Sequence, residues 1–204
     1  MLKKLASDAL GLSDIGKIID KKDFNKVDAD DYIMHEDGEQ IFFLIKSRTD
    51  EYCFTNLALI HVDGTSAVSK KRLVTRYDYY KNTIRNVAIE TAGTIDLDCE
   101  IKFVIGETIF SIDVDRNQIE QLKDLYKSLI RISHIIHEND IMLNKSEETL
   151  KIAASACASS KVVEGNVAEI FKNINEYAFN WTRISRENYI KKDFTDVFKN
   201  YINN

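Results

Sequence analysis

The hydrophobic period of the chain changes near Asn117, and this change restricts the possible folds more than any other feature of the sequence. From residue 39 to residue 114, apolar side chains recur mainly at every second position. Beyond Asn117 they recur at intervals of three and four residues. A period of two is typical of β-strands, and a period between three and four is typical of amphipathic helices. The sequence therefore predicts a β region followed by a helical region.

Turn signals divide the β region into short strands. Asp63-Gly64, flanked by apolar runs, is a strong hairpin signal, and Gly93 and Gly106 mark further turns. Since no helical period intervenes, we expect an antiparallel meander that closes as a barrel or a sandwich. The expected strands cover residues 40–47, 52–55, 57–62, 68–77, 83–91, 95–105 and 107–114.

The alternation of side chains also predicts which residues point into the β structure. It is clearest over residues 95–103, where apolar residues alternate with acidic residues and one lysine. A β-bulge would reverse this parity for the residues beyond it. The expected inward set is Phe43, Ile45, Leu57, Leu59, Val87, Ile89, Leu97, Ile101, Ile112 and Val114.

The helical region is expected to start at Asn117, where Glu120 completes a capping-box-like pattern. A helix over residues 117–137, directly after the last strand, would cover an open end of the barrel. Further helices are expected over residues 146–160, 167–184 and 190–202. Residues 1–19 predict a short amphipathic helix, and an acidic, irregular stretch follows them.

The last helices carry more apolar surface than residues 140–204 can bury among themselves, because segments of this size have marginal cores. A helical hairpin with such a seam is well suited to packing against other copies of the chain. Packing on the β region of the same chain is the alternative. The candidate interface residues are Ile170, Phe171, Ile174, Tyr177, Trp181, Phe194 and Phe198.

Composition and charge argue against several classes of protein. The chain has 28 basic and 33 acidic side chains, and neither half has the basic excess that nucleic-acid binding requires. Cys53, Cys99 and Cys157 form no CxxC pair and are expected to be reduced thiols. Without a signal-peptide pattern or an apolar run of membrane-spanning length, we expect a cytoplasmic protein, with attachment to a membrane surface as the alternative.

No grouping of reactive residues indicates catalysis. The seven glycines form neither a GxGxxG pattern nor a phosphate-binding loop, and no GxSxG nucleophile pattern occurs. Asp96, Asp98 and Glu100 alternate along one strand, as a solvated strand face does anyway. We therefore expect a protein without enzymatic activity, without a cofactor and without a metal.

One basic cluster is a candidate site for an anion such as a lipid headgroup. Lys70, Arg72 and Arg76 share the parity of one strand, and Lys46 and Arg48 lie in the first hairpin. Basic side chains on one strand face can bind an anionic group together. Ordinary solubilising charge is the alternative interpretation of the same residues.

Residues 39–114 resemble the bacterial pleckstrin-homology (PH) domains. The resemblance is carried by the segments GEQI, DEYCFTN, LALIHVDG, KKRLVTRY and IETAGTIDLDCEIKF. Residues from about 140 onward resemble the helical extension called the YvbH-like oligomerisation region. The resemblance implies an α+β fold, in which a seven-stranded antiparallel PH-like β-barrel is capped by a C-terminal helix and followed by an α-helical hairpin.

The resemblance also implies higher oligomers and no known catalytic activity. It divides the chain into a lead-in of residues 1–30, a PH-like domain of residues 31–138 and a helical oligomerisation region of residues 139–204. Two functions are compatible with it. The protein is either an oligomeric scaffold that binds another protein, or a peripheral membrane module that uses residues 1–19 and the basic cluster.

The sharpest metal-like cluster is formed by His134, His137, Glu138 and Asp140. The spacing of the two histidines places both on one helix face, where they could bind one metal. No HExxH pattern or further ligand accompanies them, so polar positions at a helix end are the ordinary interpretation. Protein purified without a His-tag is expected to contain less than stoichiometric zinc, iron or manganese by elemental analysis. An equimolar metal that is lost in His137→Ala would contradict this prediction.

Overall fold

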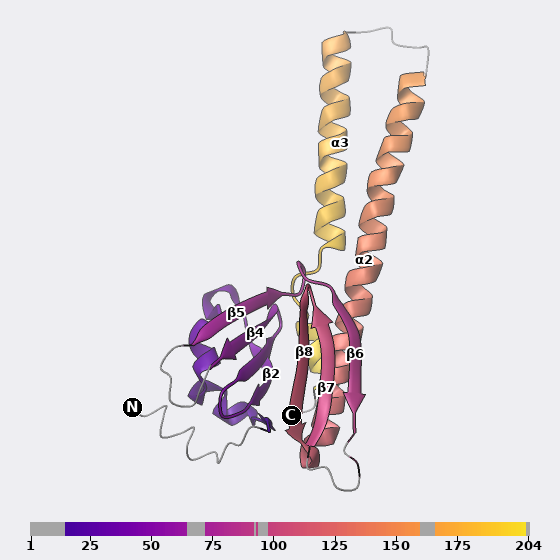
Figure 1. Ribbon diagram of the computed structural model, residues 1–204. Coiled ribbons are helices and arrows are strands. Elements are labelled where there is room, and N and C mark those ends of the chain that lie inside the picture. Colours follow the sequence, from indigo (N-terminus) through magenta and orange to yellow (C-terminus); the bar gives the residue numbers. More distant parts are fainter. Residues whose placement is uncertain (1–14, 65–71, 92, 94–97, 160–165, 203–204) are drawn as a thin grey trace. The chain divides into compact units, whose positions relative to one another are not determined.

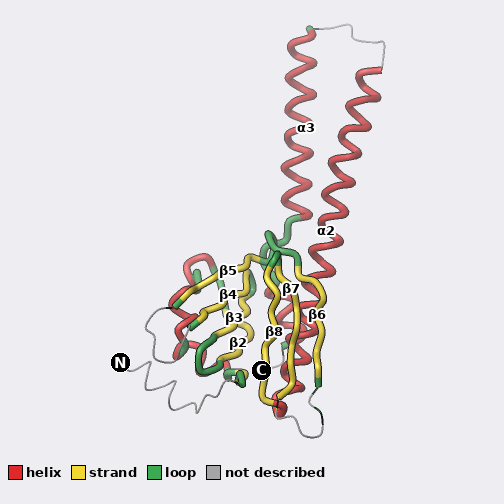
Figure 2. Tube along the Cα trace, viewed as in Figure 1, coloured by secondary structure: helices red, strands yellow, loops and turns green. Residues whose placement is uncertain are grey.

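Strands and then helices follow one another along the chain, as the change of period predicts (Figures 1 and 2). The structure is a computed structural model, which describes residues 15–64, 72–91, 93, 98–159 and 166–202. The chain divides into two compact units. The first unit comprises residues 1–133 and 192–204, and the second comprises residues 134–191. An α+β fold with antiparallel sheets and a long helix is therefore confirmed.

The first unit contains two antiparallel sheets. The larger sheet has the strand order β1-β2-β3-β4-β5 and the smaller has the order β6-β7-β8. Rings from the two sheets meet between them, with the centroids of Phe54 and Phe103 6.1 Å apart. The strands are β1 (Lys17–Ile18), β2 (Ile41–Lys46), β3 (Glu51–Thr55), β4 (Ala58–Asp63), β5 (Leu73–Asp78), β6 (Ile84–Glu90), β7 (Asp98–Ile105) and β8 (Thr108–Asp115).

The prediction of a closed seven-stranded barrel is not confirmed, because no ladder joins β5 to β6 in the part of the chain that the structure describes. The backbone N–H groups of Lys81 and Asn82 both donate to the carbonyl of Asp78, so this connection forms a tight local turn. At the opposite edge, Gly16 precedes β1 and bridges to Val114 of β8. A Cβ atom there would lie 2.7 Å from Ile45 and 2.8 Å from the Asp113 carbonyl, so only glycine permits this approach.

The inner faces of the two sheets form the core that alternation predicts. Val87 and Ile89 are half-buried, whereas Ile84 of the same strand is fully buried. The parity changes between them because of a bulge, at which Asn86 has a φ of 53°. Leu57 is half-buried and Leu97 lies outside the described residues. The other predicted inward residues are all buried, namely Phe43, Ile45, Leu59, Ile101, Ile112 and Val114.

The outer face of the larger sheet has a second core that the sequence analysis does not predict. The acidic stretch before β2 forms three short 3₁₀ helices, η1 (Lys21–Lys26), η2 (Asp28–Tyr32) and η3 (His35–Asp37). Their apolar side chains cover β2, β3 and β4, which are apolar on both faces as in a doubly buried sheet. The lead-in contributes Ile19, Phe24, Val27, Ala29 and Ile33, and the strands contribute Leu44, Cys53, Ile60 and Val62.

A buried ion pair joins the lead-in to this outer face. The carboxylate of Glu51, which is 4% exposed, pairs with the ammonium group of Lys46. It also accepts hydrogen bonds from the backbone N–H groups of Asp28 (3.2 Å) and Ala29 (2.7 Å) at the start of η2. A charged acceptor of this kind satisfies the free donors of a helix start and holds it on the sheet.

The helix after the last strand is longer than expected. A short 3₁₀ turn, η4 (Arg116–Gln118), leads into α2 (Ile119–Ser159), which runs through 41 residues without a break. The two helices expected over residues 117–137 and 146–160 are therefore one. Neither proline nor glycine lies between residue 107 and residue 164, so nothing in the sequence ends the helix. Two further helices follow, α3 (Val167–Tyr189) and α4 (Thr195–Tyr201).

The first part of α2 belongs to the first unit and is fixed there by polar contacts as well as by its buried leucines, Leu122, Leu125 and Leu129. The side chain of Gln118 accepts from the backbone N–H of Ile18 (2.8 Å) and donates to its carbonyl (2.9 Å). These two hydrogen bonds tie β1 to the segment that leads into α2.

Replacing Glu51 with alanine is expected to destabilise the fold by about 3–5 kcal/mol, because Lys46 stays buried without its partner and two backbone N–H groups lose their acceptor. Urea unfolding followed by circular dichroism measures the change. Glu187→Ala is the control, since it removes an exposed ion pair with Arg183 and is expected to cost less than about 1 kcal/mol. Equal effects of the two changes would contradict the assigned role of Glu51.

Candidate functional site

The basic side chains predicted to bind an anion lie mostly in ion pairs of the fold. Arg76 on β5 donates from Nη1 to both carboxylate oxygens of Glu39, at 3.0 and 2.9 Å, and from Nε to Asp78 at 2.6 Å. Lys46 pairs with Glu51 and is 7% exposed. These two residues of the candidate cluster are therefore corrected to structural roles, because buried carboxylates already neutralise them.

The remaining members of the cluster do not restore a basic stripe. The Nε atom of Arg72 lies 3.7 Å from a carboxylate oxygen of Asp28. Arg48 is exposed after the end of β2, and Lys70 lies outside the described residues. Arg72 directly precedes β5, which contains Arg76, and each of the two arginines faces a carboxylate of the same unit.

Glu39 explains why Arg76 is held so firmly. Its carboxylate is 1% exposed and also accepts from the Thr55 hydroxyl (2.5 Å) and the Met34 backbone N–H (2.9 Å). Burial alone would lower the pKa of Arg76, but its hydrogen bonds with Glu39 and Asp78 outweigh burial and raise that pKa above its usual value. The guanidinium is thus charged at neutral pH and is already paired with two carboxylates.

The thiols of Cys53 and Cys99 and the hydroxyl of Tyr52 have raised pKa values. Burial raises the pKa of the Cys53 thiol well above its ordinary value, and it also raises the pKa of Cys99. Burial and then the nearby carboxylate of Asp50 raise the pKa of Tyr52 to about 12. All three groups are therefore protonated at neutral pH, whereas nucleophilic catalysis needs a thiolate or an activated hydroxyl.

The histidines do not assemble a metal centre within the described ranges, where no group of three or more His, Cys, Asp or Glu residues could hold a metal ion. His134 and His137 are both exposed on α2. His61 lies beside Asp50, with Nε2 3.1 Å from the carboxylate, and its ring stacks on Tyr52 at 4.6 Å. The sequence does not signal this last pairing, since it depends on the register of β3 and β4.

The second unit consists of the later part of α2 and of α3. The two helices meet where the indole Nε1 of Trp181 donates to the hydroxyl of Ser146 at 2.9 Å. The hydroxyls of Ser146 and Ser185 lie 2.5 Å apart at the same level. Trp181 is half-buried. This predicted interface residue therefore already contacts another helix of its own chain.

Other predicted interface residues on α3 are exposed to solvent. Phe171 is 72% exposed, Ile174 is 54% exposed and Tyr177 is 64% exposed. Phe179, which is not among the predicted interface residues, is 69% exposed, whereas Ile170 is half-buried. Several exposed aromatic residues on one helix are unusual for a monomeric surface, so these residues remain candidates for an interaction site. We call Phe171, Ile174, Tyr177 and Phe179 the α3 apolar surface.

Phe194 and Phe198 must be removed from the predicted interface, because both are completely buried in the first unit. The Phe198 ring stacks on Phe42 of β2 with centroids 5.3 Å apart, and the Phe194 ring meets the edge of Tyr79 at 5.8 Å. The backbone N–H of Phe194 also donates to the Asn56 carbonyl at 2.9 Å. The alternative that the sequence left open, packing on the β region, holds for this helix.

No helix in the described ranges is long and apolar enough to cross a membrane.

Comparisons with known proteins find relatives over the whole chain. The family model described as "Bacterial PH domain" matches residues 9–133, and that described as "YvbH-like oligomerisation region" matches residues 144–204. The uncharacterized protein YvbH of Bacillus subtilis (strain 168) is 54% identical over 204 residues, with both chains covered completely.

One solved structure gives the same assignment, and a second is similar over part of the chain. A PH-domain-containing bacterial protein from Exiguobacterium sibiricum 255-15 is 46% identical, with a TM-score of 0.85 over 93% of this chain and 100% of that one. A DUF1696 family protein with a PH domain from Shewanella loihica PV-4 is 21% identical, with a TM-score of 0.46 over 58% of this chain and 97% of that one.

Phe198→Ala is expected to destabilise the first unit by about 3–5 kcal/mol, because it leaves a cavity between Phe42 and Tyr79. Ile109→Ala, at a side chain that is 79% exposed on β8, is the control and should change stability by about 0.5 kcal/mol at most. Urea unfolding compares the two variants. If Phe198→Ala were as mild as the control, the burial of α4 in the core would be wrong.

Proposed function

Because the chain belongs to the bacterial PH-domain family and carries a YvbH-like oligomerisation region, we propose that it is a non-catalytic scaffold that assembles through its helical unit. The α3 apolar surface is the observation that supports this proposal. Its four large side chains are each more than half exposed in a single chain. A second copy of the chain is the occupant that we assign to it.

The energetics are compatible with self-association. Burial of one such side chain contributes about 1.5–3 kcal/mol, so burial of four contributes on the order of 10 kcal/mol. Association costs about 4–15 kcal/mol in lost translational and rotational freedom. In a two-fold contact each copy presents this surface to the other, so the apolar side chains of both copies are removed from water. Polar side chains elsewhere on α3, such as Arg183 and Glu187, pair within the helix and remain compatible with solvent.

For the PH-like domain we propose binding of another protein in preference to a membrane. The membrane alternative relies on residues 1–19 and on the basic cluster, and Lys46 and Arg76 of that cluster are neutralised by buried carboxylates. A cytoplasmic location belongs to the same proposal. The scaffold would then display several copies of one binding domain, which raises its apparent affinity for a multivalent partner without any new contact.

Replacing the three aromatic residues of the α3 apolar surface with serine, as Phe171→Ser/Tyr177→Ser/Phe179→Ser, is expected to lower the assembly state. These side chains are 64–72% exposed, so the change removes little packing within one chain. Sedimentation velocity over a range of protein concentrations measures the mass. Circular dichroism at the same concentrations shows whether α3 remains helical.

Leu73→Ser/Ile109→Ser is the matched control, because it removes two apolar side chains that are 62% and 79% exposed on the sheets. This variant should keep the assembly state of the unaltered protein. If the triple variant retained that state and the control lost it, the assembly surface would lie on the sheets. Deletion of residues 140–204 is a weaker test, since it also removes Phe194 and Phe198 from the core of the first unit.

A further inference from the structure

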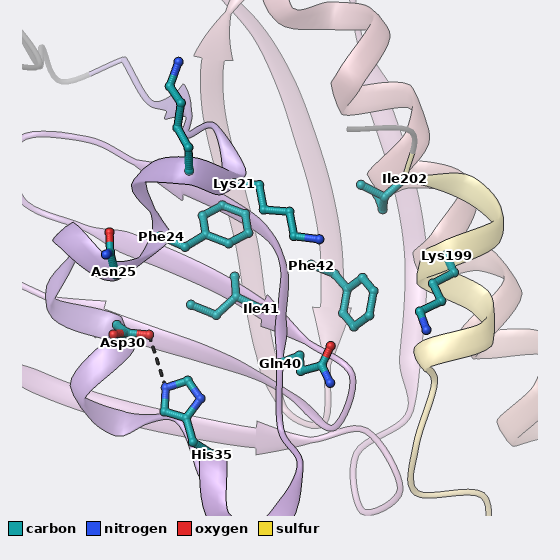
Figure 3. Close-up of a pocket in the computed structure, with 11 residues that line it drawn as sticks. Lys21, Phe24, Asn25, Asp30, His35, Gln40, Ile41, Phe42, Lys199 and Ile202 are labelled. Atoms are coloured by element: carbon teal, nitrogen blue, oxygen red, sulfur yellow. Dashed lines mark hydrogen bonds and ion pairs between the residues drawn. The ribbon is translucent and has the colours of Figure 1, made fainter.

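The first unit contains a cavity that neither the basic cluster nor the α3 apolar surface includes. It has a volume of about 620 Å³ and lies between η1, β2 and α4 (Figure 3). Phe24, Ile41 and Phe42 supply apolar walls. Lys21 and Lys199 are among the charged residues that line it, one from η1 and one from α4. Two segments that lie far apart in the sequence, η1 and α4, therefore meet around one space.

The walls of the cavity are fixed by core packing. Phe24 is 8% exposed and belongs to the outer core of the larger sheet. The ring of Phe42 stacks on the ring of Phe198, with 5.3 Å between the ring centroids. A preformed space of this size with apolar walls and a few polar groups is typical of small-molecule sites, which measure about 300–1,000 Å³.

The charge around the cavity is positive, although the chain as a whole is acidic. Three lysines, Lys21, Lys22 and Lys199, and one aspartate, Asp30, are among its lining residues. A carboxylate oxygen of Asp30 lies 3.3 Å from Nε2 of His35. The ammonium nitrogen of Lys22 lies 3.2 Å from a carboxylate oxygen of Asp20. Lys21 and Lys199 form no ion pair with any residue in the described part of the chain, and Figure 3 shows the Lys21 side chain extending toward Phe42. These two ammonium groups are thus available to an anion.

We propose that this cavity binds an amphipathic anion, in which a phosphate or carboxylate group is joined to an apolar part. The anionic group lies between Lys21 and Lys199, and the apolar part packs on Phe24, Ile41 and Phe42. Both parts are needed. Exposed lysines alone hold an inorganic ion weakly, because water and salt screen the attraction. The apolar walls supply the remaining free energy by removing hydrocarbon from water.

Hexyl phosphate is the probe, and isothermal titration calorimetry with the full chain is the measurement. We expect saturable binding to the unaltered protein and at least about tenfold weaker binding to Lys21→Gln/Lys199→Gln. Hexanol and inorganic phosphate, which each represent one half of the probe, should also bind at least about tenfold more weakly.

Lys123→Gln/Lys127→Gln is the control, because it removes the same charge from two lysines on α2 that pair with Glu120 and Asp124. It should bind hexyl phosphate as the unaltered protein does. Absence of saturable binding, equal weakening in the control, or equal affinity for inorganic phosphate would each overturn the proposal. Because both lysines lie outside the α3 apolar surface, sedimentation of the cavity variant should be unchanged, so the assembly proposal can fail or hold independently.

Vesicles identify the source of the ligand. Phosphatidylglycerol vesicles that capture the unaltered protein, but not Lys21→Gln/Lys199→Gln, would support a lipid headgroup as the ligand. Binding of hexyl phosphate without capture by these vesicles would support a free amphiphile. Phosphatidylcholine vesicles, which carry no net charge, should capture neither protein. Equal capture of both proteins by phosphatidylglycerol, without binding of hexyl phosphate, would overturn the proposal.

Discussion

Burial of both faces of the larger sheet is the constraint on which the first unit depends. β2 shows this most clearly, since Phe43 and Ile45 point into the space between the sheets while Leu44 lies in the outer core. A sheet that is apolar on both faces needs a cover on each. The smaller sheet covers one face, and the 3₁₀ helices of the lead-in cover the other. The return of α4 to Phe42 completes the cover at the end of β2.

Two basic residues of the predicted anion-binding cluster are paired with buried carboxylates inside this arrangement. Glu51 and Glu39 are both almost inaccessible to water, and each is neutralised by a basic residue that the sequence pattern presents as free. Breaking such a pair is costly because the remaining charge stays buried. The same residues cannot also serve as an open anion site. Within the described residues, Lys21 and Lys199 have no carboxylate partner, and both line the cavity between η1 and α4.

The apolar residues after α2 have two different destinations. Phe194 and Phe198 complete the core of the first unit, whereas Phe171 and Phe179 remain exposed on α3. The hairpin is thus an insertion between two segments that belong to the same folded domain. Stability and self-association can therefore be altered separately, although both depend on aromatic residues of one helical region. The family match to residues 144–204 spans both groups and does not distinguish them.

The hydrophobic period predicted most of the strands, most of the inward residues and the helix that follows β8, because each depends on local period and turn chemistry. The helix expected over residues 1–19 is not found in the described part of that segment, where Lys17–Ile18 form β1, and residues 1–14 lie outside the described residues. Sequence could not predict that the acidic lead-in covers the sheet, since its apolar residues have no regular period. It also could not separate Phe198 from Phe171, because both occupy the seams of amphipathic helices. Which seam is covered depends on contacts between residues far apart in the chain, such as Phe42 with Phe198, and so on the tertiary structure alone. The same holds for the basic side chains. The sequence does not distinguish Arg76 from Lys199, and only the tertiary structure places the carboxylate of Glu39 against Arg76.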